Sequence, residues 1–237
     1  MLPRISSFIA SLCLCASFVA VGPATAGSYD DALTAATLDR AAELSDLLER
    51  GIDPDTADTN GNTLLILAAR EGNADVVALL LKRGAKSSVQ NKAGDTALML
   101  AALKGHEVVV DRMLEAGAPV NRNGWSPLLY AAFEGHEGIV GKLLSRGANV
   151  DARAPNQSTA LMLAARNGHR GVVEALVKAG ADISLVNENG LTAAAWAREN
   201  KNTDIAEYLE SRAPAAARQR VEAKPDSGKR KMKVLIE

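Results

Sequence analysis

A pattern of twelve residues that recurs along the chain constrains its fold more than any other feature. Residues 61–72 read GNTLLILAAREG, and the pattern returns as GDTALMLAALKG at 94–105 and as GWSPLLYAAFEG at 124–135. Two further copies begin near Asn156 and Glu188. An apolar run and a Gly-Ala pair follow each of the first four copies, and the glycines of these pairs are 33, 30 and 33 residues apart. Such a period predicts an array of similar structural units.

Each unit carries the start and stop signals of two helices. A hydroxyl that can cap the free amides of a helix start recurs at Thr63, Thr96, Ser126, Thr159 and Thr192. Pro127 follows one of them, at the first helical position. Glycines suited to ending a helix in the left-handed conformation stand at 72, 105, 135 and 168 for the first helix, and at 51, 84, 117, 147 and 180 for the second. The signals predict two helices of about nine residues in each unit.

Helices of this length are marginally stable in water, so neighbouring units must cover their apolar faces. The composition suits close stacking of small helices, because 47% of the residues are hydrophobic but only 3% are aromatic. Stacked repeats of this kind need end units with modified outer faces. The first unit, residues 29–58, diverges from the pattern, and the last has Lys201 in place of a glycine. We expect the last unit to present these residues to water: Glu199, Asn200, Asn202, Asp204 and Glu207.

The repeats resemble those of the ankyrin family, whose unit is a turn and two antiparallel helices with a T-P-L-H-x-A signature. Here the signature occurs in variants such as TALMLAA, and the resemblance covers residues 29–212. It implies an all-α ankyrin-repeat solenoid of about six helix–turn–helix units with short β-turn fingers. The expected domain is 27–213, with units at 29–58, 59–91, 92–121, 122–154, 155–187 and 188–213.

Two departures from the regular repeat predict local changes in the fingers. Gly117 to Gly124 spans seven residues where Gly84 to Gly94 spans ten, which predicts a notch in the row of fingers before Gly124. Gln157 stands at a turn position that holds glycine in other units. A side chain at that position predicts an altered turn near Pro155.

The N-terminal segment has the features of an export signal. Arg4 precedes an apolar stretch over residues 5–21, and residues 24–26 form the small-residue pattern that a signal peptidase cleaves, here before Gly27. A retained membrane anchor is the alternative, although the stretch is short for a bilayer span. The signal and the repeats both resemble bacterial sequences. We therefore expect residues 1–26 to be a cleaved signal peptide and the protein to be periplasmic, with secretion as the alternative.

Residues 214–237 form a basic tail that we expect to be disordered. From Ala213 onward the chain has seven basic and three acidic residues, whereas residues 27–212 have 19 basic and 25 acidic ones. The tail is interpreted either as a solubilising extension or as a weak contact with anionic lipid or polysaccharide. An exported protein rarely meets nucleic acid, so no nucleic-acid partner is expected.

Three regularly placed histidines are of the residue type that binds metal ions or serves in acid–base catalysis. His106, His136 and His169 each follow the glycine between the two helices of a unit, so they occupy equivalent positions in successive units. Packed helices lie roughly 8–10 Å apart, whereas zinc ligands lie about 2 Å from one shared ion. We expect these side chains to make structural hydrogen bonds.

The rest of the sequence offers no constellation that predicts catalysis. Both cysteines, Cys13 and Cys15, lie inside the expected signal peptide, which leaves the mature chain without a thiolate or a disulfide. Aspartates 53, 55 and 58 fall in the turn between units, where such side chains bond the local backbone. The sequence therefore predicts no catalytic residue, no metal site and no cofactor.

The resemblance also implies where a partner binds, because ankyrin proteins hold protein partners on the concave surface of their fingers and first helices. The positions expected to project there are Thr59, Asn60, Asn62, Arg70, Glu71, Lys92, Asp95, Leu103, Lys104, Arg122, Asn123, Trp125, Phe133, Glu134, Ser158, Arg166 and Asn167.

Three apolar residues interrupt this otherwise polar surface in the middle units: Leu103, Trp125 and Phe133. Aromatic anchors inside a polar rim are typical of binding hot spots. The residues predicted to bind a partner are therefore Leu103, Trp125, Phe133, Arg70, Glu71, Lys104, Glu134, Arg166 and Asn167. In the alternative, Trp125 covers the shortened turn and Phe133 packs on the next helix. Tyr130 is assigned to the core.

These observations predict a monomeric, non-catalytic scaffold of the bacterial cell envelope that binds a protein partner through its concave surface. The alternative function is an envelope-surface adaptor that its basic tail holds to anionic lipid or polysaccharide.

Overall fold

The computed structural model describes residues 26–212, and within this range the chain forms twelve α-helices. Their bounds are α1 (Ala26–Thr37), α2 (Ala41–Glu49), α3 (Leu64–Glu71), α4 (Ala74–Lys82), α5 (Ala97–Lys104), α6 (Glu107–Glu115), α7 (Pro127–Glu134), α8 (Glu137–Ser145), α9 (Ala160–Asn167), α10 (Arg170–Lys178), α11 (Ala193–Glu199) and α12 (Thr203–Arg212). The β structure of this range is limited to two isolated bridges, Ala57 with Thr63 and Arg153 with Thr159.

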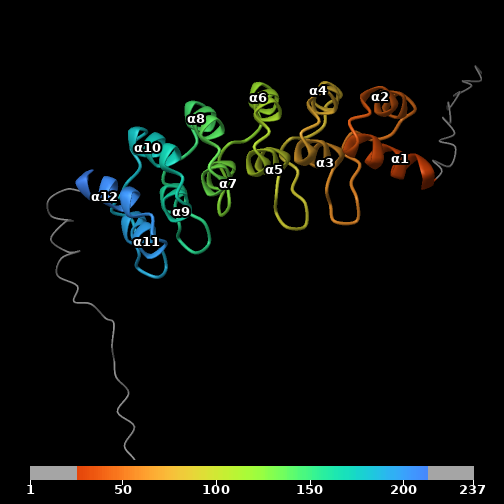
Figure 1. Cartoon of the computed structure of the whole chain (residues 1–237). Helices are drawn as coiled ribbons and strands as arrows, with labels where there is room; N and C mark the ends of the chain where they lie inside the picture. The colour runs from red at the N-terminus through yellow and green to blue at the C-terminus, as the bar shows by residue number, and fades with distance from the viewer. Residues whose placement is uncertain (1–25, 213–237) are drawn as a thin grey trace, which may run out of the picture.

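The helices form two rows that run the length of the molecule (Figure 1). The odd-numbered helices form one row and the even-numbered helices the other, and each helix packs on its neighbours in the row. Five fingers, residues 50–63, 83–96, 116–126, 146–159 and 179–192, project on the side of the odd-numbered helices. From α7 to α12 the array bends toward the fingers. The prediction of an all-α solenoid is confirmed.

The predicted start signals act as helix caps. The hydroxyl of Thr63 accepts a hydrogen bond from the amide of Ile66 at 3.2 Å, and Thr96, Ser126, Thr159 and Thr192 make the equivalent bond. Each cap satisfies one of the amides that a helix start leaves unpaired.

Left-handed residues end the helices, as the glycine pattern predicts. Gly72 ends α3 with φ 84°, and the equivalent glycines of α5, α7 and α9 have φ between 79° and 85°. Gln157 and Lys201 adopt φ values of 62° and 67° at positions where other units have glycine. The turn near Pro155 thus keeps the left-handed conformation of the glycine turns, and the predicted change there is limited to a side chain on a residue in an uncommon conformation.

The core extends without interruption from the first unit to the last. Two consecutive alanines in each of α3, α5, α7 and α9 are completely buried, which lets neighbouring helices approach closely. Larger apolar side chains fill the space between the two rows; Leu65, Leu98 and Leu128 are each 1% exposed. Every unit therefore depends on its neighbours for burial, as in other repeat arrays.

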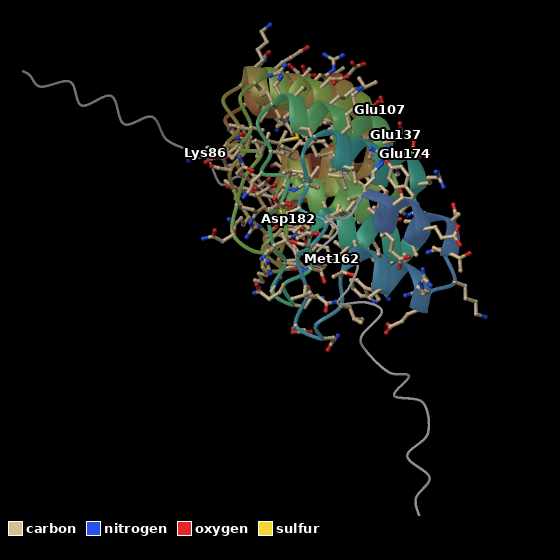
Figure 2. The ribbon with its side chains drawn as sticks, turned by 90° about the vertical axis from the view of Figure 1, so that its left-hand side faces the viewer. Lys86, Glu107, Glu137, Met162, Glu174 and Asp182 are labelled. Atoms are coloured by element: carbon tan, nitrogen blue, oxygen red, sulfur yellow. The ribbon has the colours of Figure 1, made fainter. Side chains whose placement is uncertain are left out.

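Glycines also fit the even-numbered helices together. A Cβ atom on Gly138 of α8 would lie 2.5 Å from Oε1 of Glu107 in α6, and Glu137 lies against Gly171 of α10 in the same way. A view along the row places Glu107, Glu137 and Glu174 along one edge, away from Lys86 and Asp182 in the fingers (Figure 2).

Two predicted segments lie outside the described residues: nearly all of the signal peptide at 1–26, and the basic tail at 214–237. Helix α1 begins at Ala26, three residues before the predicted start of the first unit at Tyr29. Within residues 26–212, none of the helices has the length and apolar character needed to cross a bilayer.

Candidate functional site

Four of the five fingers are closed by the same turn. The amide of Gly61 donates to the carbonyl of Asp58 at 2.9 Å, and the pairs Gly94 with Asn91, Gln157 with Ala154, and Gly190 with Asn187 repeat this bond. An Asx side chain supports three of these turns, as Asp58 does by accepting from the amides of Asn60 and Asn62. The local role predicted for the aspartates is confirmed for Asp58.

Neighbouring fingers are joined to one another by hydrogen bonds. The amide of Lys92 donates to the carbonyl of Asn60 at 2.9 Å, and the side chain of Asn91 donates to that of Asn62 at the same distance. At the other end of the row, the amide of Glu188 donates to the carbonyl of Asn156 at 3.1 Å. These bonds fix the spacing of the first two and the last two fingers.

The third finger, residues 116–126, is three residues shorter than the others, so the predicted notch is present (Figure 1). In the described part of the chain, no backbone bond joins its tip to either neighbour. Side chains make the connections instead. Arg122 donates to the carbonyl of Gly94 and contacts Gln90 and Met99, and the side chain of Asn121 donates to the carbonyl of Gly147 at 2.8 Å.

Beside the notch lies an aromatic cluster of Trp125, Tyr130 and Phe133. The rings of Trp125 and Tyr130 stack with centroids 5.0 Å apart, and Phe133 meets Trp125 edge-on at 6.5 Å. All three side chains are partly exposed. The Tyr130 hydroxyl donates to Asp95 at 2.9 Å, and burial together with this carboxylate raises the pKa of Tyr130 to about 12. The phenol is therefore neutral and held in place at physiological pH.

The structure shows how Trp125 and Phe133 are packed, and their predicted role in binding stays a prediction. Both side chains, like that of Leu103, pack against the core yet keep part of their surface in solvent. The tertiary structure places Tyr130 in the aromatic cluster, partly exposed, whereas the sequence assigns it to the core. Its equivalents Leu67 and Leu100 are only 5% and 8% exposed.

The polar residues predicted to bind a partner lie on both sides of the aromatic cluster. Arg70 and Glu71 pair at 2.8 Å and share a shallow depression with Lys104 and His106. Toward the other end, Glu134 is exposed. The guanidinium of Arg166 lies 5.0 Å from the ring of Trp196, and Asn167 donates to the carbonyl of Phe133 at 2.7 Å.

Two residues expected to project are in fact buried. Asn62 is 7% exposed because its side chain bonds both Asp58 and Asn91, and Ser158 has no exposed surface. The sequence places both at finger bases but does not show that the fold covers them. Neither residue contributes to the candidate surface.

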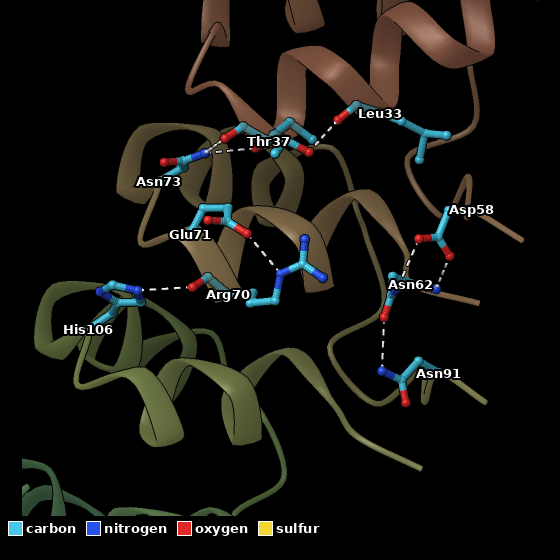
Figure 3. A network of polar contacts seen from close by, with 10 residues as sticks. Leu33, Thr37, Asp58, Asn62, Arg70, Glu71, Asn73, Asn91 and His106 are labelled. Carbon is cyan, nitrogen blue, oxygen red and sulfur yellow. Dashed lines mark hydrogen bonds and ion pairs between the residues drawn. The ribbon is translucent and has the colours of Figure 1, made fainter. Parts of the chain in front are cut away.

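The three histidines join neighbouring units. Nε2 of His106 donates to the carbonyl of Arg70 at 3.0 Å (Figure 3), and His136 and His169 bond the carbonyls of Leu103 and Phe133. The predicted structural hydrogen bonds are confirmed. Among residues 26–212, no three histidine, cysteine or acidic side chains are grouped so as to hold a metal ion.

Comparisons with known proteins agree with this geometry. The sequence matches the family described as "Ankyrin repeats (3 copies)" over residues 83–154 and 148–218, and that described as "Ankyrin repeats (many copies)" over residues 47–98. No curated protein sequence matches the chain.

Three solved structures are similar over most of the chain. One is the Bd0816 predatory endopeptidase from Bdellovibrio bacteriovorus in complex with immunity protein Bd3460, with 29% identity, a TM-score of 0.71, and coverage of 77% of this chain and 98% of that one. The ankyrin-repeat protein EF0377 has 29% identity and a TM-score of 0.70, and the alignment covers 76% of this chain and 96% of that one. The ankyrin-repeat domain of Bcl-3, of the IkappaB protein family, has 30% identity and a TM-score of 0.66, with coverage of 74% of this chain and 81% of that one.

Ankyrin repeats are modules of protein–protein interaction, so the described domain is a scaffold for protein binding. The family matches cover residues 47–218 without a gap, and the similar structures share the fold over about three quarters of the chain. The chain belongs to the ankyrin-repeat family.

Proposed function

We propose that this chain is a monomeric, non-catalytic binding protein of the bacterial cell envelope that holds a protein partner against its fingers and odd-numbered helices. The observation that carries the proposal is the aromatic cluster beside the notch, at the middle of that surface. Large, rigid aromatic side chains near the centre of an interface dominate binding energy in many complexes.

The surroundings of the cluster suit this role. The short third finger leaves the cluster without the longer finger that stands beside every other odd-numbered helix from α3 onward. Two exposed charged residues lie at the ends of the neighbouring helices, Lys104 at the end of α5 and Glu134 next to Phe133 at the end of α7. An apolar centre with a polar rim buries surface while the charges select the partner.

The similarity to the endopeptidase–immunity complex supports a protein partner and suggests which class to test first. The chain aligns with 98% of its counterpart in that structure. We propose that the partner is an enzyme exported to the same compartment.

We propose export with cleavage before Gly27. A cut after Ala26 keeps residues 27–212 together, so the first unit, which the sequence places at 29–58, stays whole in the mature protein. Protein recovered from the envelope fraction should therefore have Gly27 at its N-terminus. A mass that retains residues 1–26 would instead indicate a membrane anchor.

The binding proposal is tested with the double variant Trp125→Ala, Phe133→Ala. The mature protein is crosslinked in cell envelopes, and the crosslinked partner is identified and then titrated in purified form. We expect the double variant to lose at least about tenfold in affinity, because hot-spot truncations cost about 2 kcal/mol or more.

Tyr208→Ala is the control. It removes an aromatic side chain of α12, in the even-numbered row, which contacts Arg170 and Arg212 rather than any residue predicted to bind the partner. Thermal unfolding of both variants separates lost binding from lost structure. Unchanged affinity in a folded double variant would remove the cluster from the binding site.

A further inference from the structure

Four Asn-Gly sequences lie in the described part of the chain: Asn60-Gly61, Asn123-Gly124, Asn167-Gly168 and Asn189-Gly190. In this dipeptide the glycine amide nitrogen can attack the asparagine side-chain carbonyl, because glycine has no side chain to obstruct the approach. The attacking nitrogen must first be free of other hydrogen bonds. The fold therefore decides which of four chemically alike sites reacts.

Three of the four glycine amides are engaged. The amide of Gly61 donates to the carbonyl of Asp58 and that of Gly190 to the carbonyl of Asn187, both at 2.9 Å. Gly168 ends α9, and its amide donates to the carbonyls of Ala164 and Ala165. Attack at these three sites requires a turn or a helix end to open first.

The fourth site, in the third finger, is different. Within residues 26–212, the amide of Gly124 and the side chain of Asn123 take part in no hydrogen bond. Asn123 is exposed, and a Cβ atom built on Gly124 would meet nothing within 4 Å. Both reacting groups are thus unpaired, with free space around them.

The short length of the third finger explains this freedom. The other fingers close with a bond from the fourth turn residue to the first, but Gly124 makes no such bond to Asn121. The side chain that could support the turn, that of Asn121, bonds Asn149 and Gly147 of the next finger instead. The third finger is three residues shorter than the others, and this difference both forms the notch and leaves the Gly124 amide without a hydrogen bond.

We propose that Asn123 is a site of spontaneous modification, where the side-chain amide is converted to a carboxylate by way of a cyclic imide. The Gly124 nitrogen forms a bond to Cγ of Asn123, the Cγ–Nδ2 bond breaks, and ammonia leaves with the proton of the Gly124 amide. Water then adds to one of the two imide carbonyls and opens the ring to aspartate or isoaspartate. The net reaction consumes one water and releases one ammonia.

The product places a negative charge two residues before Trp125. If the isoaspartate form is made, the backbone also lengthens by one carbon in the loop beside the aromatic cluster. The reaction thus acts as a slow, irreversible change of the candidate binding surface. This consequence rests on the proposed function, whereas the reaction itself does not.

The reaction is tested on the mature protein incubated at mildly alkaline pH. Peptide mapping by mass spectrometry follows the aspartate and isoaspartate formed at each of the four sites over time. We expect Asn123 to convert at least about fivefold faster than Asn60, Asn167 or Asn189, the factor that corresponds to about 1 kcal/mol for opening one hydrogen bond. Equal or slower conversion at Asn123 overturns the proposal.

Two comparisons test whether the fold is the cause. In urea the four sites should convert at similar rates, and a persistent lead of Asn123 there would refute the structural explanation. In the folded chain, Asp58→Ala removes the side chain that supports the turn by accepting from the Asn60 and Asn62 amides. The bond from the Gly61 amide to the backbone carbonyl of residue 58 should then open more often, and conversion of Asn60 should accelerate. If the folded variant showed no acceleration at Asn60, that result would also count against the structural explanation. The urea comparison needs no variant, and neither test needs the partner.

Discussion

At the scale of the residue, the junctions between units are made by one repeated hydrogen bond. A histidine ring donates to a carbonyl of the preceding unit at the three inner junctions, and it lies against the glycine that ends the first helix of that preceding unit. At the two outer junctions asparagine replaces histidine. Asn73 donates to the carbonyls of Ala36 and Thr37, and Asn202 to those of Ala165 and Arg166. Two residue types thus perform the same function in one chain.

This equivalence gives a prediction for His136. His136→Ala leaves the carbonyl of Leu103 without its donor and should lower the free energy of unfolding by about 1–3 kcal/mol. His136→Asn restores a donor of the kind found at Asn73 and should recover part of that loss. Urea unfolding followed by circular dichroism measures both. Equal losses for the two variants would show that the ring's packing, not the hydrogen bond, matters.

At the scale of the element, glycines serve two distinct purposes in the helices. Gly147 follows α8 with φ 81°, a conformation that side chains with a Cβ rarely adopt. Gly141 lies inside α8 and has ordinary helical geometry, and a Cβ atom at either position would meet nothing within 4 Å. The two residues therefore differ in backbone conformation but not in available space.

Alanine at these two glycines should have opposite effects. Gly141→Ala should stabilise the protein by about 0.5–1 kcal/mol, because alanine loses less backbone freedom in a helix. Gly147→Ala should destabilise it by roughly 1–2 kcal/mol, the cost of a left-handed residue with a Cβ. Thermal unfolding of each single variant provides the measurement. Shifts of the same sign would contradict the distinction.

At the scale of the whole molecule, each unit is stabilised by the units next to it. The core is continuous, but it is built from contacts between neighbours in each row. The fingers follow the same rule, with backbone bonds joining the first two and the last two, and side chains of Arg122 and Asn121 bridging the notch. A defect should therefore spread to neighbouring units and weaken with distance.

Two buried leucines test this expectation. Leu209→Ala in α12 and Leu129→Ala in α7 each remove a side chain that is at most 1% exposed, at a cost of about 2–5 kcal/mol. For Leu209→Ala, hydrogen exchange read by mass spectrometry should show protection lost most in α11 and α12, less in α9 and α10, and little beyond them. For Leu129→Ala the loss of protection should extend to the units on both sides of α7. Uniform loss in both variants would indicate a single cooperative unit instead.

The candidate site shows where sequence reasoning stops. The notch, Trp125 and Phe133 follow from the spacing of glycines and from apolar residues on a polar face. Tyr130, in contrast, stands where three other units have a buried leucine, and only the tertiary structure shows that its ring joins Trp125 at the surface. The burial of Asn62 likewise depends on the adjoining finger, where Asn91 bonds its side chain.

The sequence by itself determined the helices, their caps and ends, the order of the units and the short third finger. These features depend on residues within one repeat, where hydroxyl caps, left-handed glycines and apolar spacing act locally. The tertiary structure decided which finger residues are covered, that Arg122 reaches Gly94, and that the Gly124 amide stays free. Each of these depends on how far one unit lies from the next, and that distance is set by packing between residues some thirty positions apart.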